Sequence, residues 1–81
     1  MLTVIETATF QHYAKSAFTE QERMAFIYWL SANPLSGDVI IGSGGLRKAR
    51  WRRLNIGKSG GVRVIYYPQV QLGVIYLLIA Y

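Results

Sequence analysis

The chain contains no cysteine and a single histidine, His12. The absence of thiols excludes disulfide frameworks, thiolate nucleophiles and cysteine-based zinc sites. One imidazole cannot form a histidine-rich metal site, and we interpret His12 as an exposed helix residue rather than as a catalyst. We therefore expect a protein that works without a metal or another cofactor.

Long hydrophobic runs are also missing. The most apolar segment is 70–81, and it is interrupted by Gln71 and Gly73. A membrane-spanning helix needs about 20 predominantly apolar residues. The start of the chain lacks the basic region and apolar stretch of a signal peptide, since Glu6 follows soon after Met1. We expect a cytoplasmic protein that does not contact a membrane.

Charged residues are scarce, because they make up 16% of the chain whereas 52% of the residues are hydrophobic. This balance excludes an intrinsically disordered chain, which combines low hydrophobicity with high charge. The length of 81 residues fits a single domain, residues 1–81. A core of this size contributes only about 3–5 kcal/mol, so a partner or self-association would stabilise the fold.

Acidic residues are absent from the second half of the chain. The net charge is +5, but residues 41–81 carry seven lysines and arginines and no aspartate or glutamate. Six of these seven lie between Arg47 and Lys58. A dense positive field of this kind favours a polyanion such as nucleic acid. The alternatives are a solvated basic surface and a patch that binds acidic residues of another protein.

The first part of the sequence predicts a strand and a helix. Met1–Glu6 is rich in β-branched residues that alternate, which is typical of a strand. Thr7 or Thr9 can cap a helix after it. The apolar residues of that helix recur at helical spacing and predict one buried stripe. Its members are Phe10, Tyr13, Ala14, Ala17 and Phe18.

A second helix follows directly. Thr19 and Glu22 have the spacing of a capping box, in which each side chain binds the other residue's backbone amide. The helix is expected to end near Ala32, because Asn33 precedes Pro34 and the residue before proline avoids the helical region. The buried candidates are Met24, Ile27, Tyr28 and Leu30.

After Pro34 the apolar period changes from 3.6 to 2, which indicates strands. Residues 39–41 are apolar and β-branched, and the expected strands after them are 46–54, 62–67 and a largely apolar, central strand 74–81. The glycines of 42–45 indicate a tight turn, since no Gly-Lys-Ser or Gly-Lys-Thr follows to make a phosphate loop. The expected fold is α+β, in the order β-α-α-β-β-β, with two N-terminal helices on one face of a mostly antiparallel sheet of about four strands.

The alternation within these strands assigns side chains to faces. Ala49 and Trp51 point toward the core, and the other face carries three basic residues, Lys48, Arg50 and Arg52. Arg63 shares its face with Ile65 and Tyr67. The same alternation leaves two interpretations open for Tyr66 and Tyr67, because each could stack on a base or form ordinary strand core.

Several blocks of the sequence together resemble one protein family. They are Gly37-Asp38-Val39-Ile40, the run Gly42-Ser43-Gly44-Gly45-Leu46-Arg47-Lys48-Ala49-Arg50, the run Gly60-Gly61-Val62-Arg63-Val64-Ile65-Tyr66-Tyr67, and the strand Ile75-Tyr76-Leu77-Leu78-Ile79-Ala80-Tyr81. Over its whole length the chain resembles the RelE/ParE toxin superfamily, and within it the HigB-like, ribosome-dependent branch of type II toxin–antitoxin systems.

The resemblance implies a cytoplasmic toxin that cuts mRNA on the ribosome without a metal and is silenced by a cognate antitoxin. In that reaction the RNA 2′-hydroxyl attacks the adjacent phosphate, and cationic side chains stabilise the charge that develops. Arg63 would clamp the phosphate, as the strand arginine of the Gly-Gly-x-Arg block. The implied catalytic residues are Arg63, Lys48 and Arg50, and the implied RNA-binding residues are Arg47, Arg52, Arg53, Lys58, Tyr66 and Tyr67.

The sequence departs from the family at its end. The family's last strand is followed by a basic segment and a C-terminal helix that carry catalytic groups, whereas this sequence stops at Tyr81. We therefore expect either a truncated chain or a shortened member, in both cases with nuclease activity reduced or lost and with an uncovered apolar strand 74–81 that promotes self-association. The alternatives are a noncatalytic domain that binds RNA or an antitoxin, and a ParE-like gyrase inhibitor.

Overall fold

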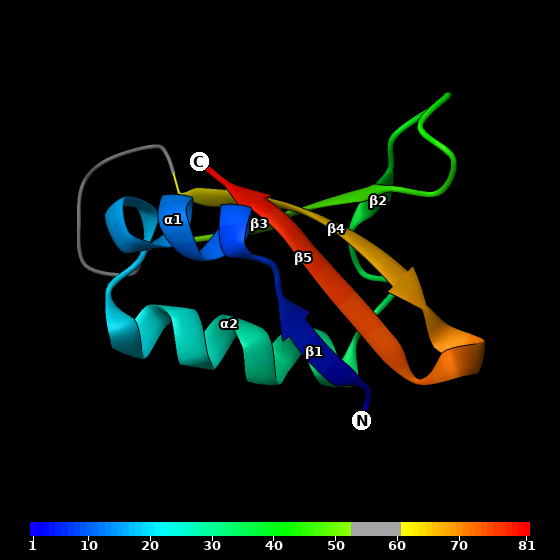
Figure 1. Cartoon of the computed structure of the whole chain (residues 1–81), viewed down its shortest axis with the longest axis horizontal. Coiled ribbons are helices and arrows are strands. Elements are labelled where there is room, and N and C mark those ends of the chain that lie inside the picture. The colour runs from blue at the N-terminus through cyan, green and yellow to red at the C-terminus, as the bar shows by residue number, and fades with distance from the viewer. Residues whose placement is uncertain (53–60) are drawn as a thin grey trace.

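The computed structural model describes residues 1–52 and 61–81. The chain forms β1 (Thr3–Glu6), α1 (Ala8–Ala17) and α2 (Glu20–Ala32), and then β2 (Asp38–Val39) and β3 (Arg47–Trp51). It continues with β4 (Val62–Gln69), a 3₁₀ turn η1 (Val70–Leu72) and β5 (Val74–Ala80). The expected arrangement of two helices against a sheet is confirmed (Figure 1).

The described residues form a sheet of five strands in the order β1-β5-β4-β3-β2, whereas about four were expected. β1 pairs with β5 in parallel, and the other three neighbouring pairs are antiparallel. β5 therefore lies inside the sheet, as predicted. The additional strand is β2, which pairs with the start of β3 over only two residues.

Both helices begin where the sequence predicts. The Thr7 hydroxyl accepts a hydrogen bond from the Phe10 amide at 3.1 Å and donates one to the Leu77 carbonyl at 2.7 Å, which fixes the start of α1 to β5. The capping box of α2 is complete: the Glu22 amide donates to the Thr19 hydroxyl at 3.1 Å, and the Thr19 amide donates to the Glu22 carboxylate at 2.8 Å.

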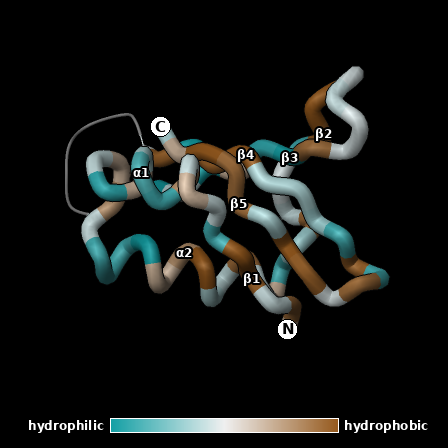
Figure 2. Tube along the Cα trace, in the orientation of Figure 1, coloured by the Kyte–Doolittle hydropathy of each residue, from teal (hydrophilic) through white to brown (hydrophobic). Residues whose placement is uncertain are grey.

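The core lies between the helices and one face of the sheet. Phe10, Ala14 and Phe18 of α1 meet Phe26 and Leu30 of α2 there. The sheet contributes Ala49, Val62, Val64, Tyr66, Ile75, Leu77 and Ala80. Apolar residues therefore alternate along the strands, and Figure 2 shows the strongest hydropathy along β1 and β5.

Three residues that we expected in the core lie on the surface. Tyr13, Met24 and Tyr28 are 46%, 60% and 69% exposed, whereas Phe26, which we did not predict, is fully buried. The reason is that α2 is apolar on more than one face, so its periodicity does not determine which face meets the sheet. The face of α2 that carries Phe26 meets the sheet, where the Phe26 ring contacts the ring of Trp51 in β3 at a centroid distance of 5.5 Å.

Candidate nucleic-acid interface

The helices leave one face of the sheet uncovered, and its side chains follow from the register. Residues that pair across neighbouring strands share a face. Arg50 pairs with Arg63, and Lys48 pairs with Ile65. Ile65 pairs in turn with Ile79, and beyond an irregularity in the ladder Tyr67 pairs with Tyr76. The uncovered face is therefore basic over β3 and the start of β4, and aromatic and aliphatic over the rest of β4 and β5.

Arg50 and Arg63, which we call the arginine pair, stand directly opposite each other. The Arg63 amide and carbonyl both bond to Tyr81, at 2.8 and 2.9 Å. Because a residue directs both backbone groups to one side in an antiparallel ladder, Arg63 and Arg50 form a non-hydrogen-bonded pair, the type whose Cα atoms come closest, at about 4.5 Å. Like charges in this position repel each other.

Lys48 completes a cationic corner, defined here as Lys48 and the arginine pair. Together with Asp38, Trp29 and the 36–37 backbone these residues line a hollow of about 250 Å³ at the edge of β3. Among residues 1–52 and 61–81, both ion pairs involve Arg23, so no described carboxylate forms an ion pair with the cationic corner. A bound anion is the group that would relieve the repulsion.

The structure thus brings the three predicted catalytic residues together, whereas the predicted RNA-binding residues lie in different parts of the molecule. Arg52 is exposed just beyond β3, and Tyr67 lies on the uncovered face. Arg53 and Lys58 lie outside the described residues. Arg47 lies on the helix side and donates to the carbonyls of Leu35 and Gly37, at 3.2 and 2.8 Å. Its guanidinium therefore fixes the connection before β2.

Tyr66 belongs to the core. Its side chain is fully buried, its hydroxyl donates to the Pro34 carbonyl at 2.9 Å, and it accepts from the Gly37 amide at 2.9 Å. Of the two interpretations that the sequence left open, the structure supports strand core for Tyr66. A base cannot stack on a ring that has no exposed surface, so we leave Tyr66 out of the candidate interface.

Sequence reasoning missed Asp38 and Trp29 at the hollow and Tyr76 on the uncovered face. Asp38 pairs with Lys48 in the register of β2 and β3. Only a two-residue strand places it there, and the sequence carries no signal for so short an element. Tyr76 could have been found, because its alternation with Ile75 and Leu77 assigns it to the face opposite the core.

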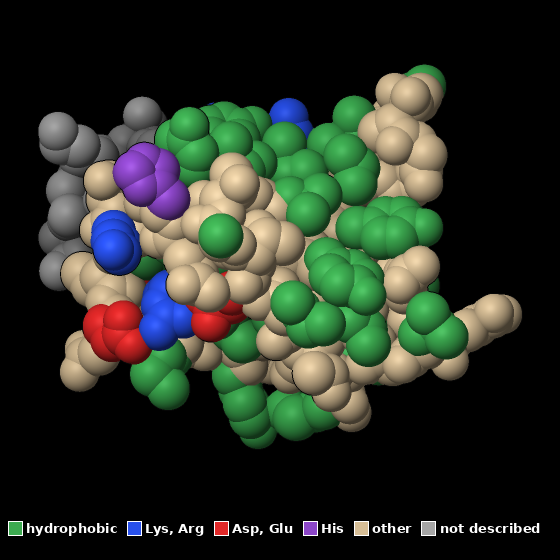
Figure 3. Space-filling model, viewed as in Figure 1, with side chains coloured by type: hydrophobic (Ala, Val, Ile, Leu, Met, Phe, Trp, Pro, Cys, Tyr) green, Lys and Arg blue, Asp and Glu red, His purple; other side chains and the backbone are tan. Residues whose placement is uncertain are grey.

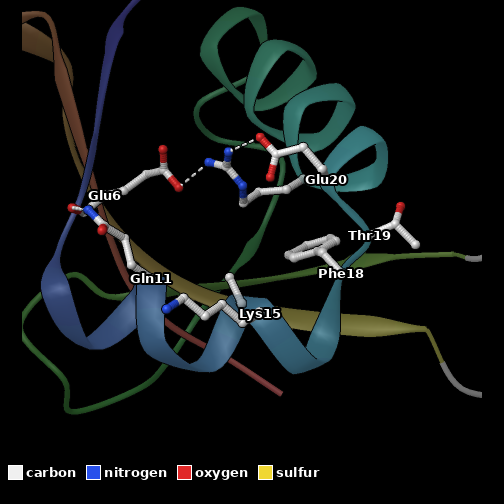
Figure 4. Close-up of a pocket in the computed structure, with 8 residues that line it drawn as sticks. Glu6, Gln11, Lys15, Phe18, Thr19 and Glu20 are labelled. Atoms are coloured by element: carbon white, nitrogen blue, oxygen red, sulfur yellow. Dashed lines mark hydrogen bonds and ion pairs between the residues drawn. The ribbon is translucent and has the colours of Figure 1, made fainter.

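A larger hollow, of about 470 Å³, lies on the other side of the molecule between α1, the start of α2 and the end of β1. Figure 4 shows the carboxylates of Glu6 and Glu20 turned toward the guanidinium between them, which belongs to Arg23. The two distances are 2.5 and 2.6 Å. The hydrogen bonds that the guanidinium donates to Glu20 and then to Glu6 raise the pKa of Arg23. Its charge is thus already neutralised, unlike that of the cationic corner.

Three further findings bear on the chemistry available. The described part of the chain contains no cluster of three potential metal ligands among histidine, cysteine, aspartate and glutamate. In the same residues, no helix combines the length and the apolar character required to cross a membrane. No protein-family model matches the sequence.

Proposed function

We propose that this protein is a toxin of the RelE/ParE type that binds mRNA on the ribosome through the cationic corner and cuts it. The observation that carries the proposal is the arginine pair: two cations directly opposite each other on an uncovered sheet face, with no ion pair to a described carboxylate. A protein gains nothing in stability from this arrangement. A phosphate between the two guanidiniums turns the repulsion into two attractive contacts.

The cationic corner suits cleavage by the RNA's own 2′-hydroxyl. In that reaction the 2′-hydroxyl loses its proton to solvent and its oxygen forms a bond to the adjacent phosphorus, which gives a 2′,3′-cyclic phosphate. The bond from phosphorus to the 5′-oxygen breaks, that oxygen takes a proton from solvent, and negative charge builds on the phosphate oxygens during the reaction. Arg63 and Arg50 would stabilise this charge, because a guanidinium can contact two phosphate oxygens at once. Lys48 would add a third positive charge at the same hollow. The chemistry requires no metal.

The test is cleavage of mRNA on purified translating ribosomes. We expect Arg63→Ala and Arg50→Ala to lose cleavage by at least about 100-fold, the range found when one group that stabilises transition-state charge is removed. Lys15→Ala is the matched control, because it removes an exposed cation from α1, on the other side of the sheet. Equal cleavage by wild type and the two arginine variants would overturn the proposal.

The second candidate is a noncatalytic domain that binds RNA. It is favoured by the composition of the cationic corner, in which none of the three residues is a histidine or a carboxylic acid that could pass a proton at neutral pH. A wild-type protein that binds single-stranded RNA but leaves ribosome-bound mRNA intact would establish this alternative. DNA breaks in the presence of gyrase would instead establish a ParE-like inhibitor.

The proposed partners follow from the same surface. They are the ribosome with its mRNA and a cognate antitoxin, all encountered in the cytoplasm. An antitoxin that silences the toxin would cover the cationic corner with acidic side chains. Self-association through an edge of β5 is not available between Val74 and Leu77, because both edges are paired there. If two copies associate through β5, they must use its uncovered face.

A further inference from the structure

Tyr67 and Tyr76, which we call the tyrosine pair, lie side by side on the uncovered face. They are direct partners in the register of β4 and β5. Ile5 of β1 is the next residue in the same row, because it pairs with Tyr76 from the other side. Both tyrosines are partly exposed, and Figure 3 shows that hydrophobic side chains gather over β5. The row is a continuous apolar surface that no helix covers.

Within the part of the chain that the structure describes, polar contacts do not hold these two rings. No hydrogen bond of either phenol to another described residue is present. Gly45 restricts Tyr67 from one side: a Cβ at this glycine would lie 3.1 Å from Cε1 and 3.8 Å from Cδ1, and no other ring atom would be within 4 Å. The loop before β3 therefore contacts one edge of the ring, and it does so only because Gly45 has no side chain.

The tyrosine pair shares its face and a strand with the arginine pair. Tyr67 follows Arg63 by four residues on β4, which corresponds to about 13 Å at the rise of an antiparallel strand. A stacked strand rises about 3.4 Å per nucleotide along its axis, so about four stacked nucleotides span the distance from one pair to the other. A face with cations at one end and aromatic rings at the other fits a short single-stranded nucleic acid.

We propose that the tyrosine pair is a stacking platform for two bases of the RNA strand whose phosphates the arginine pair binds. The inference rests on the proposed function in one respect, that RNA is the occupant. Charge decides between this occupant and a second copy of the chain. A second copy placed with its own uncovered face here would bring two cationic corners together, whereas an RNA strand neutralises the corner and covers the rings.

The experiment is binding of a six-nucleotide RNA that carries the fluorescent base 2-aminopurine, whose emission falls when the base stacks. We expect wild type to quench the emission. Tyr67→Leu and Tyr76→Leu should each weaken binding by roughly 5- to 150-fold, the range for one lost base–aromatic stack. Tyr67→Phe and Tyr76→Phe should bind as wild type, because the ring remains. Tyr28→Leu is the matched control, since this tyrosine is 69% exposed on α2.

Two further measurements separate stacking from charge. An abasic oligonucleotide of equal length should bind wild type at least as weakly as either leucine variant binds normal RNA, because its phosphates remain and both stacked bases are gone. The dependence of binding on salt should be unchanged in the leucine variants and reduced in Arg63→Gln, which removes a phosphate contact. The abasic comparison uses wild type alone, so it holds even where a variant fails to fold.

The outcomes distinguish this inference from the proposed function. If wild type cuts ribosome-bound mRNA but binds abasic and normal RNA equally, the platform is wrong and the proposed cleavage stands. If wild type does not cut, yet stacks 2-aminopurine in a manner that requires both tyrosines, the platform stands and the cleavage is wrong. Dimers that persist when RNA is added, with no quenching, would show that a second copy occupies the face.

Discussion

Replacing one member of the arginine pair should stabilise the free protein. Arg50 is exposed and faces Arg63 directly across two strands. Two unit charges about 6 Å apart repel by about 0.7 kcal/mol in water, and cross-strand pairs contribute about 0.2–1 kcal/mol. We therefore expect Arg50→Gln to raise the free energy of unfolding by about 0.5–1 kcal/mol. For a domain of this size the gain corresponds to about 2–8 °C in Tm.

The assay is thermal unfolding at two ionic strengths, compared with Arg52→Gln. This control removes the same charge from an exposed residue beyond the end of β3, where no cross-strand partner is present in the described sheet. At about 0.01 M salt, where the Debye length is about 30 Å, Arg50→Gln should exceed the control in Tm. At about 1 M salt, where that length is about 3 Å, the difference should vanish.

The reasoning fails if Arg50→Gln and Arg52→Gln have the same Tm at both salt concentrations, since the effect would then reflect net charge alone. It also fails if Arg50→Gln is less stable than wild type at low salt. RNA binding by Arg50→Gln provides a second test of the same reasoning. The same substitution should weaken RNA binding while it strengthens the fold, because the repulsion in the free protein is the attraction for phosphate in the complex.

Three other substitutions test how the interface is supported. Tyr66→Phe should lower the free energy of unfolding, measured in urea, by about 1–3 kcal/mol, because it leaves the buried amide of Gly37 without its hydrogen-bond acceptor. A loss near zero would contradict this role of the Tyr66 hydroxyl. Gly61→Ala should lower Tm more than Gly42→Ala, since the Cβ at Gly61 would lie 2.7 Å from a backbone oxygen whereas the space at Gly42 is open; the two residues have φ of +118° and +77°. Equal Tm losses would contradict a role for this close contact. Arg23→Met should lower the free energy of unfolding by at most about 1 kcal/mol. The loss should be equal at pH about 6 and about 9, because the pKa of Arg23 is raised in the folded state. The stabilisation from such a group is complete at every pH below its pKa in the unfolded chain and disappears only as the pH rises through its pKa in the folded protein.

The local features of this fold could be predicted from the sequence because their causes are local. The capping box of Thr19 and Glu22 is complete, and Ala49 lies on the core side of its strand as alternation requires. The rotation of α2 could not be predicted, since its apolar residues surround the helix. The parallel pairing of β1 with β5 also escaped, because it joins the two ends of the sequence and no short-range pattern encodes it.

The candidate site, like the fold, was predictable from the sequence only in part. Alternation places Lys48 and Arg50 on one face of their strand, and the register of β3 with β4 then sets Arg50 against Arg63. A one-residue shift in that register would have separated them, and the sequence does not determine it. Arg47 belongs to the same run of basic residues, yet its hydrogen bonds to the carbonyls of Leu35 and Gly37 remove it from the interface. Composition alone does not distinguish Arg47 from a cation that is free to bind RNA.

The pairing of β1 with β5 has a consequence for folding during synthesis on the ribosome. The Thr7 hydroxyl bonds to the Leu77 carbonyl across a sequence separation of 70 residues. β5 is thus synthesised after the other strands of the described sheet, and in that sheet β1 has no neighbour until β5 emerges. Contacts so distant along the chain form slowly. We expect the nascent chain to stay without its completed sheet, and hence without an assembled interface, until translation has passed β5.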